Sequence, residues 1–229
     1  MSTTYCLLKT NPVKRLFISK SILDLANLPS YCETNGISLV AQSLIRFEAV
    51  PFTLTQPCQV IFFGSIRAVR FFLQHTEMPT GVAVACIGST TAERIRSLGI
   101  EVDFIGDKSG QPDRVADDFV RWVGQRRVLI PSSEQSNRAI AKKLPIDQYE
   151  EVHVYRTLDA CQPIDESDVY VFTSPSNLKS FLTCNPKPIG IIIAWGETTA
   201  KALREANIHV TKTLHHSTEA ALIEYLTKD

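Results

Sequence analysis

Four short polar turns contain the residues whose types and spacing suit ligand binding or catalysis. They are Gly64-Ser65, Gly88 to Thr91, Thr173-Ser174 and Gly196 to Thr199. Each turn follows an apolar run and precedes a helical pattern, which is typical of a strand that leads into a helix. Helix N-termini offer unpaired N–H groups and partial positive charge, and hydroxyl side chains add hydrogen-bond donors. The four turns therefore indicate a site for an anionic ligand.

Helix capping is the simpler explanation for any one of these turns. Thr90 with Glu93 has the spacing of a capping box, and so has Ser132 with Gln135. The turns nevertheless come in matched pairs, and ligands of α/β proteins bind beyond the carboxyl ends of strands. The set as a whole favours neither explanation over the other, and both can hold for the same turn.

Tyr155 is a further candidate, because it lies in an extended segment within Val154-Tyr155-Arg156-Thr157. A phenol can donate a hydrogen bond to a bound or departing group. The competing interpretation is an aromatic side chain that packs across a two-stranded ribbon. The pattern alone favours packing.

The sequence contains no motif for a nucleotide or a metal ion. It lacks Gly-x-Gly-x-x-Gly after a strand, and it lacks the phosphate loop of nucleoside triphosphatases. His215-His216 is the only histidine pair, and adjacent side chains seldom converge on one ion. The cysteines form no Cys-x-x-Cys pair; they stand at positions 6, 32, 58, 86, 161 and 184. We therefore expect no metal site and reduced thiols throughout.

Charge and composition exclude several classes of partner. Lys and Arg number 24, Asp and Glu also number 24, and no region is strongly basic, which argues against nucleic acid. Apolar residues at 44% and charged residues at 21% are typical of a soluble globular protein. Apolar runs such as Ile189 to Trp195 are too short to span a membrane, and the first residues do not resemble a secretory signal. We expect a cytoplasmic protein.

Short apolar runs alternate with amphipathic segments along the chain, which indicates βα units and parallel sheets. The expected strands are 15–19, 59–64, 82–87, 101–105, 126–130, 168–173, 189–194 and 208–212. The expected helices are 22–34, 66–75, 90–98, 113–123, 134–144, 176–183, 197–206 and 217–227. Val60 to Leu73 is echoed by Val169 to Leu182, and Val84 to Ala92 by Ile192 to Ala200. We therefore expect an α/β fold with two similar parallel-sheet domains built from duplicated βα units.

Two segments lack a following helix and predict long strands, namely 38–50 and 150–159. If these strands pair, the chain crosses between the domains twice and the pair forms a two-stranded ladder that can act as a hinge. We then expect the following division. Domain 1 comprises 1–44 and 160–229, domain 2 comprises 48–154, and the crossing strands are 45–47 and 155–159, with the active site in the cleft between the domains.

The order and spacing of these motifs resemble the uroporphyrinogen-III synthase family over nearly the whole chain from Arg15. The most specific parts are Val154-Tyr-Arg-Thr157, Phe172-Thr-Ser-Pro-Ser176, the Gly-x-Thr-Thr-Ala turns at 88 and 196, and Ser217-Thr-Glu-Ala220. The resemblance implies a monomeric lyase without a cofactor. Its substrate would be a linear tetrapyrrole, hydroxymethylbilane, which it would cyclise to uroporphyrinogen III with loss of water and inversion of the last pyrrole ring.

The resemblance also implies particular site residues by motif position. Tyr155 would be the catalytic donor to the departing hydroxyl group. The substrate carboxylates would be bound by Ser65, Arg67, Thr91, Ser174, Thr198 and Thr199. Arg156 and Lys179 are further candidate cations beside these turns, although Lys179 is better explained as a solvated side chain.

Three positions depart from the usual family pattern. The opening strand ends in Ile18-Ser-Lys-Ser21 instead of Thr-Arg, Gly64 stands where Thr is frequent, and Trp195-Gly-Glu197 replaces Ile-Gly-Pro. Glu197 would place a carboxylate near an anion site. The alternative function is a non-catalytic two-domain module that binds a small anionic ligand, and an appended partner domain would be its distinguishing feature.

Overall fold

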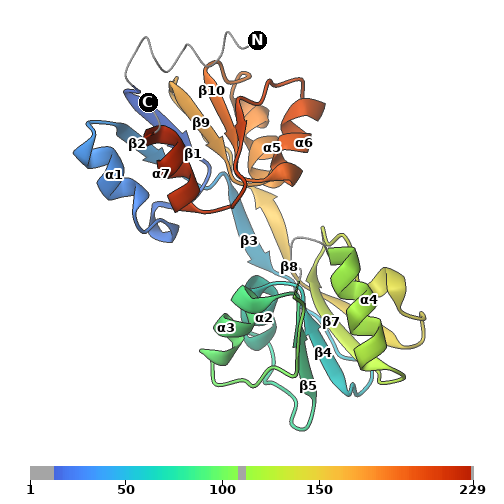
Figure 1. Ribbon diagram of the computed structural model, residues 1–229. Helices are drawn as coiled ribbons and strands as arrows, with labels where there is room; N and C mark the ends of the chain where they lie inside the picture. The colour runs from blue at the N-terminus through green and yellow to red at the C-terminus, as the bar shows by residue number, and fades with distance from the viewer. Residues whose placement is uncertain (1–12, 108–111, 228–229) are drawn as a thin grey trace. The chain divides into compact units, whose positions relative to one another are not determined.

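A computed structural model describes residues 13–107 and 112–227 (Figure 1). Contacts divide the chain into two compact units. Unit 1 comprises the residues up to Arg46 and those from Leu158 onward, and unit 2 comprises Phe47–Thr157. That these units are domains able to move separately, with bounds at 44, 48, 154 and 160, remains a prediction.

Unit 1 contains a parallel sheet with the strand order β11-β10-β9-β1-β2. Its strands are β1 (Arg15–Ile18), β2 (Ser38–Ala41), β9 (Val169–Phe172), β10 (Ile191–Ala194) and β11 (Lys212–Thr213). Its helices are η1 (Ile22–Asp24), α1 (Leu28–Thr34), α5 (Pro175–Cys184), α6 (Glu197–Glu205) and α7 (Glu219–Thr227). Alternate strand residues point to opposite faces. Leu16 and Ile18 therefore share a core with α1 and α7, whereas Phe17 packs with α5 and α6.

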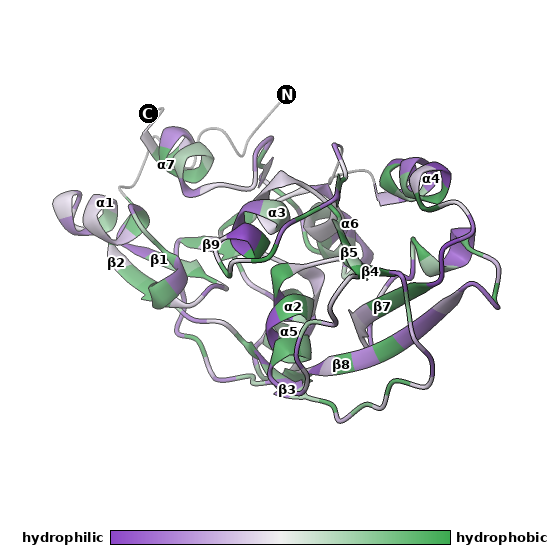
Figure 2. Ribbon diagram, turned by 90° about the horizontal axis from the view of Figure 1, so that it is seen from below, coloured by the Kyte–Doolittle hydropathy of each residue, from purple (hydrophilic) through white to green (hydrophobic). Residues whose placement is uncertain are grey.

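Unit 2 contains a sheet with the order β3-β8-β7-β4-β5-β6. Its strands are β3 (Ile45–Ala49), β4 (Val60–Phe63), β5 (Ala83–Cys86), β6 (Phe104–Ile105), β7 (Val128–Ser133) and β8 (Tyr149–Asp159). Its helices are α2 (Ile66–Leu73), α3 (Ser89–Arg96), α4 (Pro112–Val123) and η2 (Ala141–Lys143). Ile61 and Phe63 pack with α2 and α3, and Phe62 packs with α4. Hydrophobic and hydrophilic residues alternate along α4 (Figure 2), as its one buried face requires.

The predicted α/β class with parallel sheets is confirmed. Strands expected at 15–19, 59–64 and 82–87 appear as β1, β4 and β5, each within one residue or so of the expected bounds. Strand order also corresponds between the sheets, because β2-β1-β9-β10-β11 in unit 1 matches β8-β7-β4-β5-β6 in unit 2. The repeated segments of the sequence therefore hold equivalent positions in their own sheets.

The prediction of one long strand over 38–50 is wrong, because the segment forms two strands. β2 pairs with β1 in unit 1, and β3 pairs with β8 in unit 2. Leu44 between them is fully buried, and its backbone bonds Asn177 and Ala160 instead of a neighbouring strand. By contrast, β8 extends as one strand from Tyr149 to Asp159, as predicted.

Two predicted helices and one strand are also corrected. The helix expected at 22–34 is divided into η1 and α1, because Pro29 is accepted only in the first turn of a helix. Residues 134–144 form turns and the short η2, because serine and asparagine side chains bond the nearby backbone. The strand expected at 208–212 is only β11, since Asn207 has a positive φ and Ile208 bonds back to Leu203.

The expectation of reduced thiols throughout is wrong for one pair. Cys161 and Cys184 form a disulfide that joins the segment after β8 to the end of α5. The sequence separation of 23 residues gave no signal for this pairing, because only the fold brings the two ends together. Cys32, Cys58 and Cys86 are free thiols, and burial raises the pKa of each. Cys6 lies outside the described residues.

Glu219 caps a helix other than its own. Its carboxylate accepts the backbone N–H groups of Ala26, Asn27 and Leu28 at 2.8 to 3.0 Å, at the start of α1. Asn27, the N-cap residue of α1, makes no capping bond with its side chain. Burial raises the pKa of Glu219, but these three N–H groups lower it more, so its net pKa lies below the ordinary value. The Ser217-Thr-Glu-Ala220 motif thus links α7 to α1.

We expect Glu219→Gln to destabilise the protein at neutral pH. A group whose pKa is lowered by folding stabilises the folded state above its unfolded pKa, and this stabilisation is lost as the pH falls through the folded pKa. The variant should lose about 1 kcal/mol at pH 7 and almost nothing below about pH 4. Urea unfolding at both pH values measures the difference. Glu166→Gln, an exposed carboxylate before β9, serves as the control and should show no loss at either pH.

Candidate functional site

The four polar turns all lie at the carboxyl end of a strand and at the start of a helix. Ser65 joins β4 to α2, and Gly88 joins β5 to α3 in unit 2. Ser174 joins β9 to α5, and Gly196 joins β10 to α6 in unit 1. The placement that the sequence predicts is therefore correct for every turn. In each unit, one turn carries a serine and the neighbouring turn carries a glycine at the helix N-cap.

The two serines cap their own helices. Ser65 Oγ accepts the N–H of Ala68, and Ser174 Oγ accepts the N–H of Asn177, both at 3.2 Å. The capping explanation thus holds for these turns. A serine hydroxyl that accepts one such bond still has its own proton to donate.

The two glycine turns leave helix N–H groups open. Gly88 and Gly196 have no side chain to cap α3 and α6. Among the described residues, the N–H groups of Ser89 and Thr90, and likewise those of Glu197 and Thr198, have no acceptor. The predicted capping box of Thr90 with Glu93 is wrong, because α3 starts at Ser89 and Gly88 is its N-cap. Open N–H groups at a helix start are the chemistry that binds carboxylates.

The predicted threonines differ in how far their side chains reach solvent. Thr198 is exposed, Thr91 is half-buried, and Thr199 is 3% exposed. The hydroxyl of Thr198 is therefore better placed for a ligand than that of Thr199. Glu197, which departs from the family pattern, forms an ion pair with Arg204 at 2.7 Å. Its carboxylate thus has a cationic partner on the same helix.

The end of β1 in unit 1 is joined to the Ser174 turn. Ser19 is fully buried, and its Oγ accepts the N–H of Thr173 at 2.8 Å, while Thr173 Oγ1 donates to the Ser19 carbonyl at 2.6 Å. The ammonium group of Lys20 lies 5.4 Å from the ring centre of Trp195. Two departures from the family pattern, at Lys20 and Trp195, are therefore in contact with each other. A cation over an aromatic face is a favourable pair.

Tyr155 packs between two aromatic side chains of unit 2. Its ring is stacked on Phe71 at 5.2 Å and meets Phe47 of β3 edge-on at 5.9 Å. The guanidinium group of Arg67 lies 3.5 Å from the ring centre of Phe47 and 5.8 Å from that of Tyr155. The cross-strand packing interpretation is thus correct. No hydrogen bond to the Tyr155 hydroxyl is found in residues 13–107 and 112–227, so the phenol remains able to donate one.

A cavity of about 350 Å³ in unit 2 brings two predicted residues together, since both Ser65 and Tyr155 line it. Its apolar wall is formed mainly by Phe62, Ile87, Ile130 and Ile140. Its polar wall comes from the end of β7 and the segment that follows it, which contribute Ser132, Ser133, Ser136, Asn137 and Arg138. Thr91 does not line the cavity. Ser174, Thr198 and Thr199 belong to unit 1.

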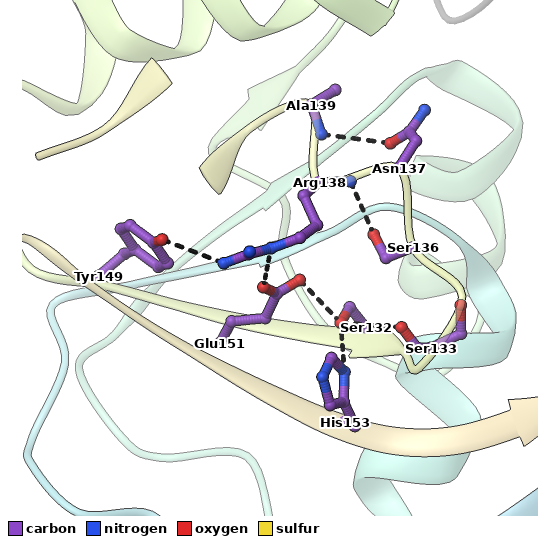
Figure 3. A network of polar contacts seen from close by, with 9 residues as sticks. All are labelled: Ser132, Ser133, Ser136, Asn137, Arg138, Ala139, Tyr149, Glu151 and His153. Atoms are coloured by element: carbon purple, nitrogen blue, oxygen red, sulfur yellow. Dashed lines mark hydrogen bonds and ion pairs between the residues drawn. The ribbon is translucent and has the colours of Figure 1, made fainter. Parts of the chain in front are cut away.

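The polar wall is part of a hydrogen-bond network that the sequence did not predict (Figure 3), and of its members Ser132, Arg138 and Glu151 line the cavity. Arg138 Nε donates to Glu151 Oε2 at 2.7 Å, and Ser132 Oγ donates to Glu151 Oε1 at 3.0 Å. Ser132 Oγ also lies 3.2 Å from His153 Nδ1, and Arg138 Nη2 lies 3.2 Å from the Tyr149 hydroxyl. The hydrogen bond with Glu151 raises the pKa of Arg138.

One sequence signal could have found this wall. The run Ser132-Ser133-Glu134-Gln135-Ser136-Asn137 is rich in side chains that bond the adjacent backbone, which is typical of turns. We instead expected a helix and a capping box at Ser132, and both are wrong. Ser132 lies in β7, which ends at Ser133, and Gln135 accepts the N–H of Thr157. The positions of Glu151 and His153 on β8 gave no such signal.

The other candidate cations are already paired or exposed. Arg156 pairs with Glu48, and this bond raises its pKa. Lys179 is exposed on α5. Among the described residues, no cluster of His, Cys, Asp or Glu could hold a metal ion. None of the helices in those ranges is long and apolar enough to cross a membrane.

Asn177 fixes the Ser174 turn to the chain segment before β3. Its carboxamide accepts the N–H of Leu44 at 2.8 Å and donates to Ser174 Oγ at 3.1 Å. Asn177 is 5% exposed, and Leu44 is fully buried. Ser180 of the same helix, also fully buried, donates to the Leu44 carbonyl. The backbone N–H and the carbonyl of Leu44 thus both have a hydrogen-bond partner on α5.

We expect Asn177→Ala to lower the free energy of unfolding by about 1 to 3 kcal/mol, because the buried N–H of Leu44 loses its acceptor. Urea unfolding measures the loss. Ser176→Ala changes the neighbouring exposed residue of α5 and should have little effect. Equal stability of the two variants would contradict the role assigned to Asn177.

Comparisons with known proteins agree on one family. The sequence model of the family described as Uroporphyrinogen-III synthase HemD matches residues 26–226. No curated protein matches the chain in sequence. The fold is similar to a crystal structure of uroporphyrinogen-III synthetase from Helicobacter pylori, with a TM-score of 0.69 and 18% identity over 93% of this chain and 97% of that one. It is also similar to a mutant uroporphyrinogen III synthase from Thermus thermophilus, with a TM-score of 0.59 and 15% identity over 93% and 97% of the two chains.

Proposed function

Because this chain belongs to the uroporphyrinogen-III synthase family, we propose that it cyclises hydroxymethylbilane to uroporphyrinogen III in tetrapyrrole biosynthesis. The match over residues 26–226 is the observation that carries this proposal. The reaction releases water and inverts the last pyrrole ring, which makes the protein a lyase. We further propose that it acts as a monomer and needs no cofactor.

The chemistry asks the protein mainly for positioning. Loss of the hydroxyl group from the first ring gives an azafulvene, and the substituted carbon of the last ring attacks it. A spiro intermediate forms, fragments and closes again with that ring reversed. Without control of shape, the bilane closes to the isomer in which no ring is inverted. Holding two reacting ends in one geometry can supply a large part of a rate enhancement.

The substrate carries eight carboxylates, and the helix-starting turns are suited to binding them. The open N–H groups after Gly88 and Gly196 point to carboxylate binding at α3 and α6. We propose that Thr91, Thr198 and Thr199 act at these two turns, and that Ser65, Arg67 and Ser174 act at the serine turns. Spreading the charge over many small contacts explains how a chain of zero net charge binds so anionic a molecule.

Tyr155 is the proposed donor to the departing hydroxyl group. Its ring is held by Phe47 and Phe71, and it lines the cavity beside Ser65. A phenol fixed in this way can donate a hydrogen bond as the C–O bond breaks, and general acids of this kind contribute roughly 100- to 10,000-fold in rate.

We expect the purified protein to form uroporphyrinogen III from freshly prepared hydroxymethylbilane. Oxidation of the products to porphyrins and separation by chromatography measures the ratio of the two isomers. The inverted isomer should exceed the other clearly, and the ratio should depend on protein concentration. A product mixture equal to that of a sample without protein would refute the proposed function.

We expect Tyr155→Phe to lower kcat by about 100-fold or more while leaving the fold intact. Phenylalanine keeps the ring packing and removes only the hydroxyl group. Tyr170→Phe is the matched control, because it also removes a buried tyrosine hydroxyl, one that accepts the N–H of Ser167 at 3.0 Å. The control should lose some stability and keep its kcat. Full activity of Tyr155→Phe would remove Tyr155 from the mechanism.

A further inference from the structure

We propose that the cavity of unit 2 binds one pyrrole ring of the substrate, with Arg138 as the partner of a carboxylate on that ring. The proposal rests on the proposed function and adds to it a subsite and a residue. It is drawn from the size of the cavity, from its two unlike walls and from the way in which Arg138 is held.

The cavity fits part of the substrate rather than all of it. Its volume of about 350 Å³ lies near the lower end of the range of roughly 300 to 1,000 Å³ for small-molecule sites. A single pyrrole ring with its two acid side chains fits such a space, whereas a tetrapyrrole exceeds it. The apolar wall, which includes Phe62 and Ile130, suits the ring face. The polar wall suits its acid side chains.

Charge favours an anion over a cation in this cavity. Among the described residues that line it, only Arg138 and Glu151 are charged. Both oxygens of Glu151 already accept hydrogen bonds, one from Ser132 and one from Arg138. The Glu151 side chain is only 8% exposed, whereas that of Arg138 is 50% exposed. An entering ligand therefore meets the cation more readily than the carboxylate.

The guanidinium group is held in place and still has donors to offer. Nε bonds Glu151 and Nη2 bonds Tyr149, while Nη1 has no acceptor among the described residues. An arginine has five N–H donors in a planar arrangement that matches a carboxylate. Hydrogen bonds between charged groups are about twice as strong as those between neutral groups. Ser133, Ser136 and Asn137 supply further donors beside it.

The backbone at Arg138 supports a functional role. Arg138 has a φ of +58°, and it shares a positive φ with only one other non-glycine among the described residues, Asn207. Its N–H donates to Ser136 Oγ at 3.1 Å, and the next N–H, of Ala139, donates to Asn137 Oδ1 at 3.2 Å. Such a conformation costs energy and persists where the surroundings fix it. Here it directs the arginine side chain to Glu151 and the cavity wall.

We expect the subsite to contribute to substrate binding and little to the rate of the chemical step. Arg138 holds a carboxylate before and after the ring inversion alike, so its contact does not strengthen in the transition state. Removal of such an interaction raises KM and leaves kcat nearly unchanged. This effect differs from that of Tyr155, which lines the same cavity but would act on the departing hydroxyl group.

Kinetic measurements on Arg138→Gln and Arg138→Lys test the proposal. We expect KM to rise about 10- to 100-fold in Arg138→Gln, with kcat changed by less than about threefold. Arg138→Lys should show a smaller rise, because lysine keeps the charge but cannot bond Glu151, Tyr149 and a ligand together. Arg121→Gln is the matched control, since Arg121 is an exposed arginine paired with Asp118 on α4. Its KM should equal that of the wild type.

Loss of Arg138 leaves Glu151 buried without its cation, so stability is measured alongside activity. If Arg138→Gln does not fold, the double variant Arg138→Gln, Glu151→Gln replaces the ion pair by a neutral pair. It should fold and show the same rise in KM. A wild-type KM in a folded Arg138→Gln or in the double variant would overturn the proposal.

A direct binding measurement separates this proposal from the proposed function. The probe is a monopyrrole that carries one acetate and one propionate side chain, added to the ¹⁵N-labelled full chain. We expect shifts of the amide signals of Ser133, Ser136 and Asn137 in the wild type and much smaller shifts in Arg138→Gln. Shifts confined to other residues would overturn the subsite. If instead the wild type formed no inverted isomer, the proposed function itself would fail.

Discussion

The parallel direction of the strands is the constraint on which the four helix-starting turns of both units depend. Parallel neighbours end at the same edge of their sheet, as β9 with β10 and β4 with β5 do. The turns that follow them therefore lie next to each other within each unit. Residues inside these strands are buried and apolar, so they offer no group to a ligand. In these three strands, β4, β9 and β10, the groups offered to a ligand therefore lie in the turns at their ends, whereas Tyr155 and Glu151 lie within β8.

The N-cap residue, which precedes the first residue of each helix, then decides how open the helix N-terminus is. Ser65 and Ser174 use their hydroxyl oxygens to bond their own helices, which fixes the turns but occupies one N–H group in each. Gly88 and Gly196 leave the first N–H groups of α3 and α6 without a described acceptor. Each unit therefore has one turn whose helix N-terminus is capped by a serine and one turn whose helix N-terminus is left open by a glycine. This division suits a ligand with many carboxylates, because open N-termini bind charge and capped ones keep the site in shape.

The ion pair of Arg138 and Glu151 is a feature that core packing alone does not require. A carboxylate that is only 8% exposed destabilises the fold unless it is paired and hydrogen-bonded. Glu151 is paired and hydrogen-bonded through Arg138 and Ser132. Arg138 reaches Glu151 from a backbone conformation with a positive φ, which itself costs energy. Two apolar residues at these positions would avoid the desolvation of the carboxylate. They would also give no reason for the strained backbone at residue 138. The presence of this polar pair in the cavity that Tyr155 and Ser65 also line is consistent with binding of a polar ligand.

The sequence by itself determined the α/β class, most strands and helices, and the positions of the four turns, because apolar periodicity and turn residues are local signals. The resemblance of motifs such as Val154-Tyr-Arg-Thr157 also indicated the family. Only the tertiary structure decided that 38–50 forms two strands, that Cys161 meets Cys184, and that Glu219 caps α1. It alone placed Arg138 beside Glu151. Some of these features join residues that are far apart in the chain. Others depend on side chains whose hydrogen bonds to the backbone outweigh the helix propensity of the segment. No local pattern in the sequence encodes either kind.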